Sequence, residues 1–344
     1  MGTNAVLRGL FLSFLFLVAG AVAVRAAETP ASTGNPMRIT TDESFLSIQT
    51  TDRVLLRYHY QNVPFKPYVQ ELFTPHGQNI LRDAPADHLH HHGLMFAVGV
   101  NKVSFWQETE DAGREVHRGF ADVRIGTRNN IPWAEFTEQV DWISSANQEL
   151  LLKELRFVEV LHSTEFAATV VSWQSSLAAA PGKESVTLNG AHYYGLGMRF
   201  LESMDKAGEF LNGGTDAVEV VRGDERNFRS TWCAYTANAD GKPVTVAMFD
   251  RPDNPRHPAT WFIMTTPFAY LSATLNVRKQ PLEVTEDNPL VVRYGIALWD
   301  GRVEVTQIER ACRWWVNWSS PDTAGPPQAD EGGKHGEKRT TKSR

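Results

Sequence analysis

The sequence predicts an all-β fold, a large two-sheet antiparallel β-sandwich with a short C-terminal helix. First, the dominant hydrophobic period between Met37 and about Trp318 is two residues, as in half-buried strands. Second, turn signals such as Asn212-Gly213-Gly214 recur between the alternating segments. Third, we count roughly fifteen strand candidates over about 280 residues, too many for a small immunoglobulin-like unit.

Residues 1–26 have the pattern of a secretory signal peptide. Arg8 supplies the positive charge, the apolar run Leu10–Val24 has 15 residues and no charge, and Val24-Arg25-Ala26 offers small residues at a cleavage site. The run is short for a membrane span, which needs about 20 apolar residues. We therefore expect a secreted or periplasmic protein that does not span a membrane once mature. An uncleaved membrane anchor is the alternative.

A flexible segment, residues 27–39, precedes the strands. No Gly/Ser-rich or Pro-rich linker and no internal repeat divides the region after it, so we expect a single domain at 40–318. The best strand candidates in chain order are residues 45–48, 53–58, 119–125, 155–160, 243–249 and 291–298.

The strands are followed by one helical pattern and a polar tail. Within Val303–Trp318, the side chains of Ile308, Ala311, Cys312 and Trp315 share one face, which predicts a helix that closes the sheet. Residues 319–344 contain no Val, Ile, Leu, Phe, Trp or Tyr, so we expect a disordered tail.

Charge and cysteine content exclude several classes of protein. The chain has 34 Lys+Arg against 40 Asp+Glu, a formal net charge of −6, which argues against a protein that binds nucleic acid. Removal of residues 1–26 takes away two arginines and gives 32 − 40 = −8. Two cysteines are too few for a disulfide scaffold or a four-cysteine zinc site. Cys233 and Cys312 either pair or remain buried free thiols.

A histidine cluster at residues 88–92 is the strongest local signal. In an extended chain, His88, His90 and His92 would share one face and His91 would point the other way. Such a cluster supplies a general acid or base near neutral pH, hydrogen bonds to a polar ligand such as a sugar, or ligands for a divalent metal. A metal would need a further ligand such as Glu108 or His192. The structural alternative is a polar strand start whose imidazoles are satisfied by neighbours.

Standard catalytic signatures are absent from the sequence. It contains no His-Glu-x-x-His motif, no Gly-x-Ser-x-Gly elbow in a plausible setting, no P-loop and no dinucleotide-binding glycine fingerprint. Serine-hydrolase and nucleotide chemistry are therefore unsupported.

Other polar and aromatic side chains are candidates to complete a site with the histidines. The loop at 250–258 has Pro at three of nine positions and is either a structural corner or a rigid ligand loop. The strand at 193–200 has small residues that allow other groups to approach its backbone closely. Aromatic rings beside polar groups suit a sugar, which has apolar faces and polar edges. The candidate ligand-binding residues are Arg57, Lys66, Tyr68, Trp106, His192, Arg199, Asn254, Arg256, His257 and Trp261.

Several motifs together resemble a known family. They are Lys66-Pro67-Tyr68 and the segments 72–77, 87–94, 103–106 and 249–261. In this order they resemble the secreted bacterial family labelled "methane oxygenase PmoA-like", a domain of unknown function, over about residues 40–318. His92 and Met95 depart from the expected Arg and Trp. The resemblance implies a galactose-mutarotase-like supersandwich, an architecture whose members bind, epimerise, hydrolyse or cleave carbohydrates.

We weigh three functions. The first is an extracytoplasmic carbohydrate-active protein of epimerase, hydrolase or lyase type, with His88, His90 or His91 as the acid and Glu108 as the base. Its basic side chains, Arg57, Lys66, Arg199 and Arg256, would orient hydroxyls or the carboxylate of an acidic sugar. The second is a non-catalytic glycan-binding module. The third is a metal-dependent oxidoreductase or hydrolase. The sequence specifies neither the sugar, nor the reaction, nor the oligomeric state.

Overall fold

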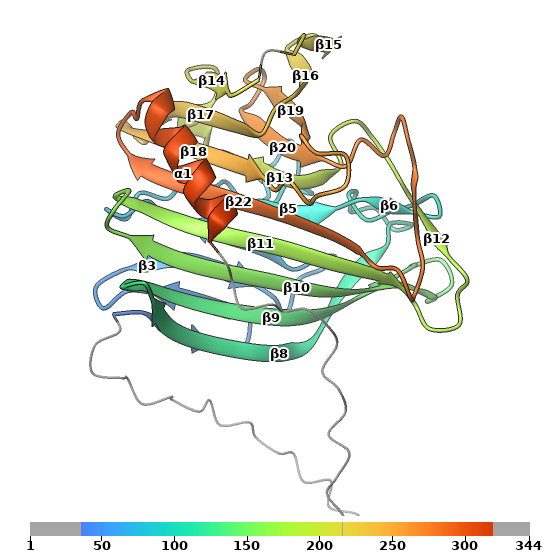
Figure 1. Ribbon diagram of the computed structural model, residues 1–344. Helices are drawn as coiled ribbons and strands as arrows, with labels where there is room; N and C mark the ends of the chain where they lie inside the picture. Colours follow the sequence, from blue (N-terminus) through green and yellow to red (C-terminus); the bar gives the residue numbers. More distant parts are fainter. Residues whose placement is uncertain (1–35, 215, 319–344) are drawn as a thin grey trace, which may run out of the picture.

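Two large antiparallel sheets pack face to face in the computed structural model, which describes residues 36–214 and 216–318 (Figure 1). The predicted sandwich is thereby confirmed. In spatial order, the ten-stranded sheet contains β1 (Arg38–Thr41), β2 (Phe45–Gln49), β3 (Val54–His59), β4 (Tyr68–Leu72), β5 (Leu94–Ala97), β13 (Gly195–Arg199), β20 (Tyr270–Thr274), β19 (Thr260–Met264), β16 (Glu225–Arg229) and β15 (Glu219–Arg222).

The second sheet has eight strands, and a smaller third sheet has four. In spatial order, the eight-stranded sheet contains β14 (Glu209–Asn212), β17 (Trp232–Ala239), β18 (Lys242–Asp250), β22 (Leu290–Asp300), β11 (Ala168–Ala179), β10 (Leu150–Ser163), β9 (Ile131–Ile143) and β8 (Arg114–Arg128). The four-stranded sheet contains β21 (Leu282–Val284), β12 (Val186–Asn189), β6 (Gly99–Val100) and β7 (Val103–Ser104). A short 3₁₀ helix, η1, spans Glu202–Met204.

The strands form where the sequence alternates. All six of the best strand candidates lie in β2, β3, β8, β10, β18 and β22, apart from Arg53, which directly precedes β3. In β2 the burial alternates: Leu46 and Ile48 are buried, and Phe45, Ser47 and Gln49 are partly exposed. In β22 the segment 294–299 is buried throughout, because one face contacts the other sheet and the opposite face is covered by the helix.

The C-terminal helix covers the outer face of the eight-stranded sheet. Helix α1 (Val305–Asn317) buries Ile308, Ala311, Cys312 and Trp315, as predicted, and lies across β18 and β22 (Figure 1). Its buried face joins Phe249, Ala297 and Trp299 in a hydrophobic cluster separate from the main core.

The two cysteines lie in different cores. Cys233 belongs to the main core and Cys312 to the cluster under α1, and both are buried free thiols. Of the two alternatives open in the sequence, the structure therefore has the free thiols.

Some predictions fall outside the described residues. The signal peptide at 1–26, residues 27–35 of the N-terminal segment and the tail at 319–344 are among them. Within residues 36–214 and 216–318, no helix has the length and apolar character needed to cross a membrane.

Candidate functional site

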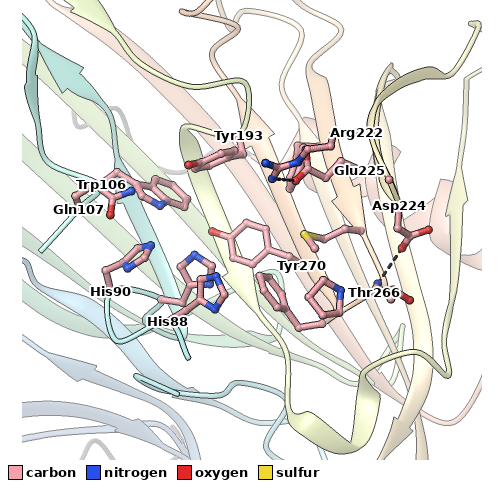
Figure 2. A pocket seen from close by; sticks show the side chains of 16 residues that line it. His88, His90, Trp106, Gln107, Tyr193, Arg222, Asp224, Glu225, Thr266 and Tyr270 are labelled. Atoms are coloured by element: carbon pink, nitrogen blue, oxygen red, sulfur yellow. Dashed lines mark hydrogen bonds and ion pairs between the residues drawn. The ribbon is translucent and has the colours of Figure 1, made fainter. Parts of the chain in front are cut away.

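A pocket of 440 Å³ lies beside β13, β20, β19 and β16 of the ten-stranded sheet. Figure 2 shows His88 and His90 on one side, Arg222, Asp224 and Glu225 on the other, and Tyr270 between them. The pocket is lined by His88, His90, His91, Trp106, Gln107, Tyr193, Arg222, Gly223, Asp224, Glu225, Phe262, Met264, Thr266, Pro267, Phe268 and Tyr270.

The histidine segment reaches the pocket through two consecutive turns. The amide of His88 donates to the carbonyl of Pro85 at 2.8 Å, and the amide of His91 donates to the carbonyl of His88 at 2.9 Å. The prediction of an extended segment with alternating faces is therefore wrong. His88, His90 and His91 line the pocket, whereas His92 points away from it.

Two of the pocket histidines, His90 and His91, are held in the neutral form. Burial lowers the pKa of His90 to about 4, and burial with the neighbouring His90 lowers the pKa of His91 to about 2. The rings of His88 and His91 stack with centroids 4.6 Å apart. At neutral pH the imidazoles of His90 and His91 can exchange hydrogen bonds with a ligand, but they are poor cationic acids.

Aromatic rings form the floor of the pocket. Tyr270 on β20 pairs with Met264 on β19, and Phe262, two residues from Met264, shares its strand face. Trp106 stacks on Tyr194 with centroids 5.0 Å apart. Phe262 and Tyr270 come from the paired strands β19 and β20, and Trp106 and Tyr194 come from the loops that follow β7 and precede β13, so sheet pairing and two loops together assemble the aromatic surface.

Three polar atoms on this floor have no hydrogen-bond partner within residues 36–214 and 216–318. They are the indole Nε1 of Trp106, the hydroxyl of Tyr270 and Nδ1 of His91. The three ring centroids are 5.4 to 6.3 Å apart. Each of these atoms is itself buried, but buried polar groups are normally paired, so three unpaired ones in side chains that line one cavity favour a polar ligand there.

The opposite wall has a fixed carboxylate. Oε1 of Glu225 lies 2.5 Å from the Arg222 guanidinium, and Oε2 lies 3.2 Å from Nε2 of His192. Arg278 approaches Nδ1 of His192 at 3.0 Å. A guanidinium only donates, so Nδ1 accepts and Nε2 carries the hydrogen that His192 donates to Glu225. Burial lowers the pKa of His192, which agrees with this neutral form.

A charged network lies behind the histidine wall. His92 places Nδ1 at 2.6 Å from Asp83 and Nε2 at 2.9 Å from Glu108, and Lys66 donates to Glu108 at 2.6 Å. Tyr68 donates to Asp83 at 2.9 Å. Burial disfavours the charged form of His92, but the hydrogen bonds to Asp83 and Glu108 outweigh it and raise its pKa.

Glu108, predicted as the base, belongs to this network and does not line the pocket. Burial would raise its pKa, but the hydrogen bond from His92 and the charge of Lys66 lower it. Lys66, Tyr68, His92 and Glu108 therefore act together as a scaffold that holds the histidine segment against the segment containing Trp106 and Gln107.

The structure places the remaining predicted basic residues away from the lining. Arg57 pairs with Glu71 at 3.1 Å. Arg199 lies beneath Phe268, 3.6 Å from its ring centroid. Arg256 donates to the carbonyl of Leu275 at 2.6 Å.

The loop at 250–258 is a structural corner. Asp250 accepts hydrogen bonds from Asn254 at 2.7 Å and from the amide of Ala259 at 2.7 Å, and it lies 2.6 Å from Nδ1 of His257. Trp261, which follows the corner, is fully buried and donates to the carbonyl of Ser230.

The structure brings five of the predicted site residues to the pocket. Four of them line it, namely His88, His90, His91 and Trp106. The fifth, His192, contacts Glu225, a carboxylate that lines it.

Sequence reasoning missed the far wall and most of the floor. Arg222, Asp224 and Glu225 lie around the turn between β15 and β16, where Gly223 has φ +53°. A turn signal was readable there, but nothing local indicates that this hairpin reaches the histidines. Tyr270 and Phe262 resemble ordinary core residues of alternating strands.

Within residues 36–214 and 216–318, no three His, Cys, Asp or Glu side chains are grouped so that they could hold a metal ion. The rings of His88, His90 and His91 pack on one another, and His92 has both nitrogens on carboxylates. The residues thus do not form the ligand set that the metal hypothesis requires.

The chain belongs to a family described as "Family of unknown function (DUF6807)", which it matches over residues 46–313. No curated protein matches its sequence.

Several solved structures resemble its fold. One is the galactosidase domain of the α-galactosidase-sucrose kinase AgaSK, at 10% identity and TM-score 0.47, covering 77% of this chain and 42% of that one. An α-galactosidase from Lactobacillus brevis has 9% identity and TM-score 0.42, covering 80% of this chain and 41% of that one. A galactose mutarotase-like protein from Clostridium acetobutylicum has 8% identity and TM-score 0.40, covering 78% of this chain and 100% of that one. The chain thus spans less than half the length of the first two.

Proposed function

We propose that the protein binds a carbohydrate in this pocket. The observation that carries the proposal is the combination of aromatic faces with unpaired polar edges in one cavity of 440 Å³. A pyranose presents C–H faces that pack on aromatic rings and hydroxyls that both donate and accept hydrogen bonds. Neutral imidazoles, an indole N–H, a phenol and a carboxylate match those hydroxyls.

Titration of a panel of methyl glycosides against the full chain tests this proposal. Replacing Tyr193 or His90 by Ala should weaken binding roughly 5–20-fold, because each removes a ring that lines the pocket. His76→Ala is the matched control, since its side chain is 81% exposed and does not line the pocket. Equal affinity in all four proteins, or no binding by any glycoside, would contradict the proposal.

Three further expectations are kept as proposals. We propose an extracytoplasmic location, supported by the apolar run and cleavage pattern in residues 1–26. We also propose that residues 40–318 form a single domain, supported by the continuous family match over 46–313. The finer family assignment, to the group labelled PmoA-like, is supported by the order of its motif blocks.

A further inference from the structure

The fixed charges on the pocket wall leave an excess of negative charge. Arg222 is the cation, with an 80% exposed side chain, and its charge is already met by Glu225 at 2.5 Å. His90 and His91 are neutral at neutral pH, and any charge on His88 is met by Asp87 at 3.1 Å. Among the described residues that line the pocket, Asp224 is the carboxylate without an ion-pair partner.

Asp224 has one oxygen that accepts no hydrogen bond from the described residues, and its side chain lines the pocket. Its Oδ2 accepts hydrogen bonds from the amide and hydroxyl of Thr265, both at 2.7 Å, and from the amide of Thr266 at 2.9 Å. Oδ1 accepts none from the described part of the chain. Burial would raise the pKa of Asp224, but these hydrogen bonds outweigh it and lower the pKa, so the carboxylate is charged at neutral pH.

Neighbouring arginines do not neutralise this carboxylate by contact. Arg226 lies close enough to lower the pKa of Asp224, but its Nη1 donates to the carbonyls of Gly223 at 2.7 Å and Glu225 at 3.1 Å. Beneath the pocket, Arg199 faces Asp205 at 3.9 Å. Arg82 shares Asp205 at 3.9 Å and pairs with Glu202 at 3.1 Å, so two arginines face two carboxylates in that layer.

Aromatic rings strengthen the preference for a cation. Tyr193, Phe262 and Tyr270 line the same pocket as Asp224, and the face of an aromatic ring attracts an ammonium group. We infer that the preferred ligand is an amino sugar whose protonated amino group lies against Asp224 and the aromatic rings. This inference rests on the proposed sugar binding, and it replaces the acidic sugar suggested by Arg57, Lys66, Arg199 and Arg256, all of which lie outside the lining.

The experiment compares three ligand charges on one sugar frame. The full chain is titrated with the methyl glycosides of glucosamine, glucose and glucuronic acid, and with those of galactosamine, galactose and galacturonic acid. In the series that binds, we expect the amine to bind roughly 5–10-fold more tightly than the neutral glycoside, and the acid more weakly. About 0.5 M salt should reduce the preference, because the site is open to solvent.

The outcomes separate the inference from the proposed function. If a neutral glycoside binds and its amine binds no more tightly, the inference fails while sugar binding stands. If no glycoside of either series binds, both fail. Preference for the acid would restore the earlier hypothesis of an acidic sugar.

Two variants locate the charge. Asp224→Asn should bring the affinities for the amine and the neutral glycoside to within about twofold of one another, because it removes the charge and keeps the shape of the side chain. Glu219→Gln is the matched control, because Glu219 lies in the same hairpin, pairs with Lys279 at 2.7 Å and does not line the pocket. If Asp224→Asn keeps the preference, or Glu219→Gln loses it, Asp224 is not the group that selects the amine.

Discussion

His92 lies with both ring nitrogens on carboxylates, Asp83 and Glu108, and its ring stacks on Tyr68 with centroids 4.1 Å apart. Two carboxylate acceptors require two N–H donors, so the hydrogen-bonded form is the imidazolium. With Lys66, the network then contains two positive and two negative charges. The resemblance led us to expect Arg at this position, and His92 supplies the same charge in a form that titrates.

Titration of His92 should make stability depend on pH. Because its pKa in the folded protein is raised above the ordinary value of 6.5, the stabilisation is fully present below pH 6.5 and is lost as the pH rises through the raised pKa. We expect the contribution of His92, taken as the difference in the free energy of unfolding between the wild type and His92→Gln, to fall by about 1.4 kcal/mol for each unit of that elevation. The difference is needed because the lowered pKa values of His90, His91 and His192 change stability in the opposite sense over the same pH range. Urea unfolding between pH 6 and 9 measures this contribution to the free energy of unfolding.

Two variants isolate this effect. His92→Gln removes the charge and should lower stability at pH 6 much more than at pH 9, whereas the exposed His76→Gln should leave the slope unchanged. A difference between the wild type and His92→Gln that is the same at pH 6 and at pH 9 would contradict this account of His92.

At the scale of the element, the pocket depends on the close approach of β13 to the residues that cover it. Gly197 pairs with Met95 on β5 and with Ser272 on β20. A Cβ on Gly197 would lie 1.9 Å from the Tyr270 hydroxyl and 3.2 Å from the Trp106 ring. The glycine therefore lets the hydroxyl of Tyr270 lie directly over the strand.

Gly197→Ala should push Tyr270 away from the strand and disturb the pocket floor. We expect a loss of about 1–3 kcal/mol in stability from the steric conflict, together with weaker glycoside binding. Adding Tyr270→Phe, which removes the atom nearest to the new methyl group, should restore part of the stability. A double-mutant cycle by urea unfolding measures this coupling, and additive effects would contradict the account.

At the scale of the molecule, the fold was more predictable than the site. The alternation in residues 45–48 and 291–298 and the apolar face of Ile308, Cys312 and Trp315 are local patterns, so the sequence predicts strands and a helix there. His88, His90, His91 and Trp106 were also recognisable as site residues. Asp224, Glu225 and Tyr270 were not, because the pairing order β13-β20-β19-β16 brings them together from distant parts of the chain. The role predicted for Glu108 was wrong because its side chain bonds to His92, and the position of His92 depends on the two turns of the histidine segment.

Arg156 joins the two large sheets through a buried polar network. Arg156 lies on β10, and its five N–H groups donate five hydrogen bonds of 2.8 to 3.0 Å. Two go to Glu154, and one each goes to Glu115, the Tyr58 hydroxyl and the Pro67 carbonyl. Its side chain is fully buried. Burial, offset only in part by Arg156, raises the pKa of Glu115 to about 8. Removing the guanidinium would leave the buried Glu154 without its cation and Glu115 without its hydrogen-bond donor.

Arg156→Met should therefore cost about 3–5 kcal/mol in the free energy of unfolding, as expected when one partner of a buried ion pair is removed. The exposed Arg118→Met, which loses an ion pair with Asp141, should cost at most about 1 kcal/mol. Adding Glu154→Gln to Arg156→Met should recover stability, because Glu154 accepts two hydrogen bonds from Arg156 and would otherwise be left as a buried carboxylate without its cation. Urea unfolding of the three variants and the wild type at pH 7 measures these differences. Equal costs for Arg156→Met and Arg118→Met would mean that the two sheets are held by apolar packing alone, without a contribution from this network.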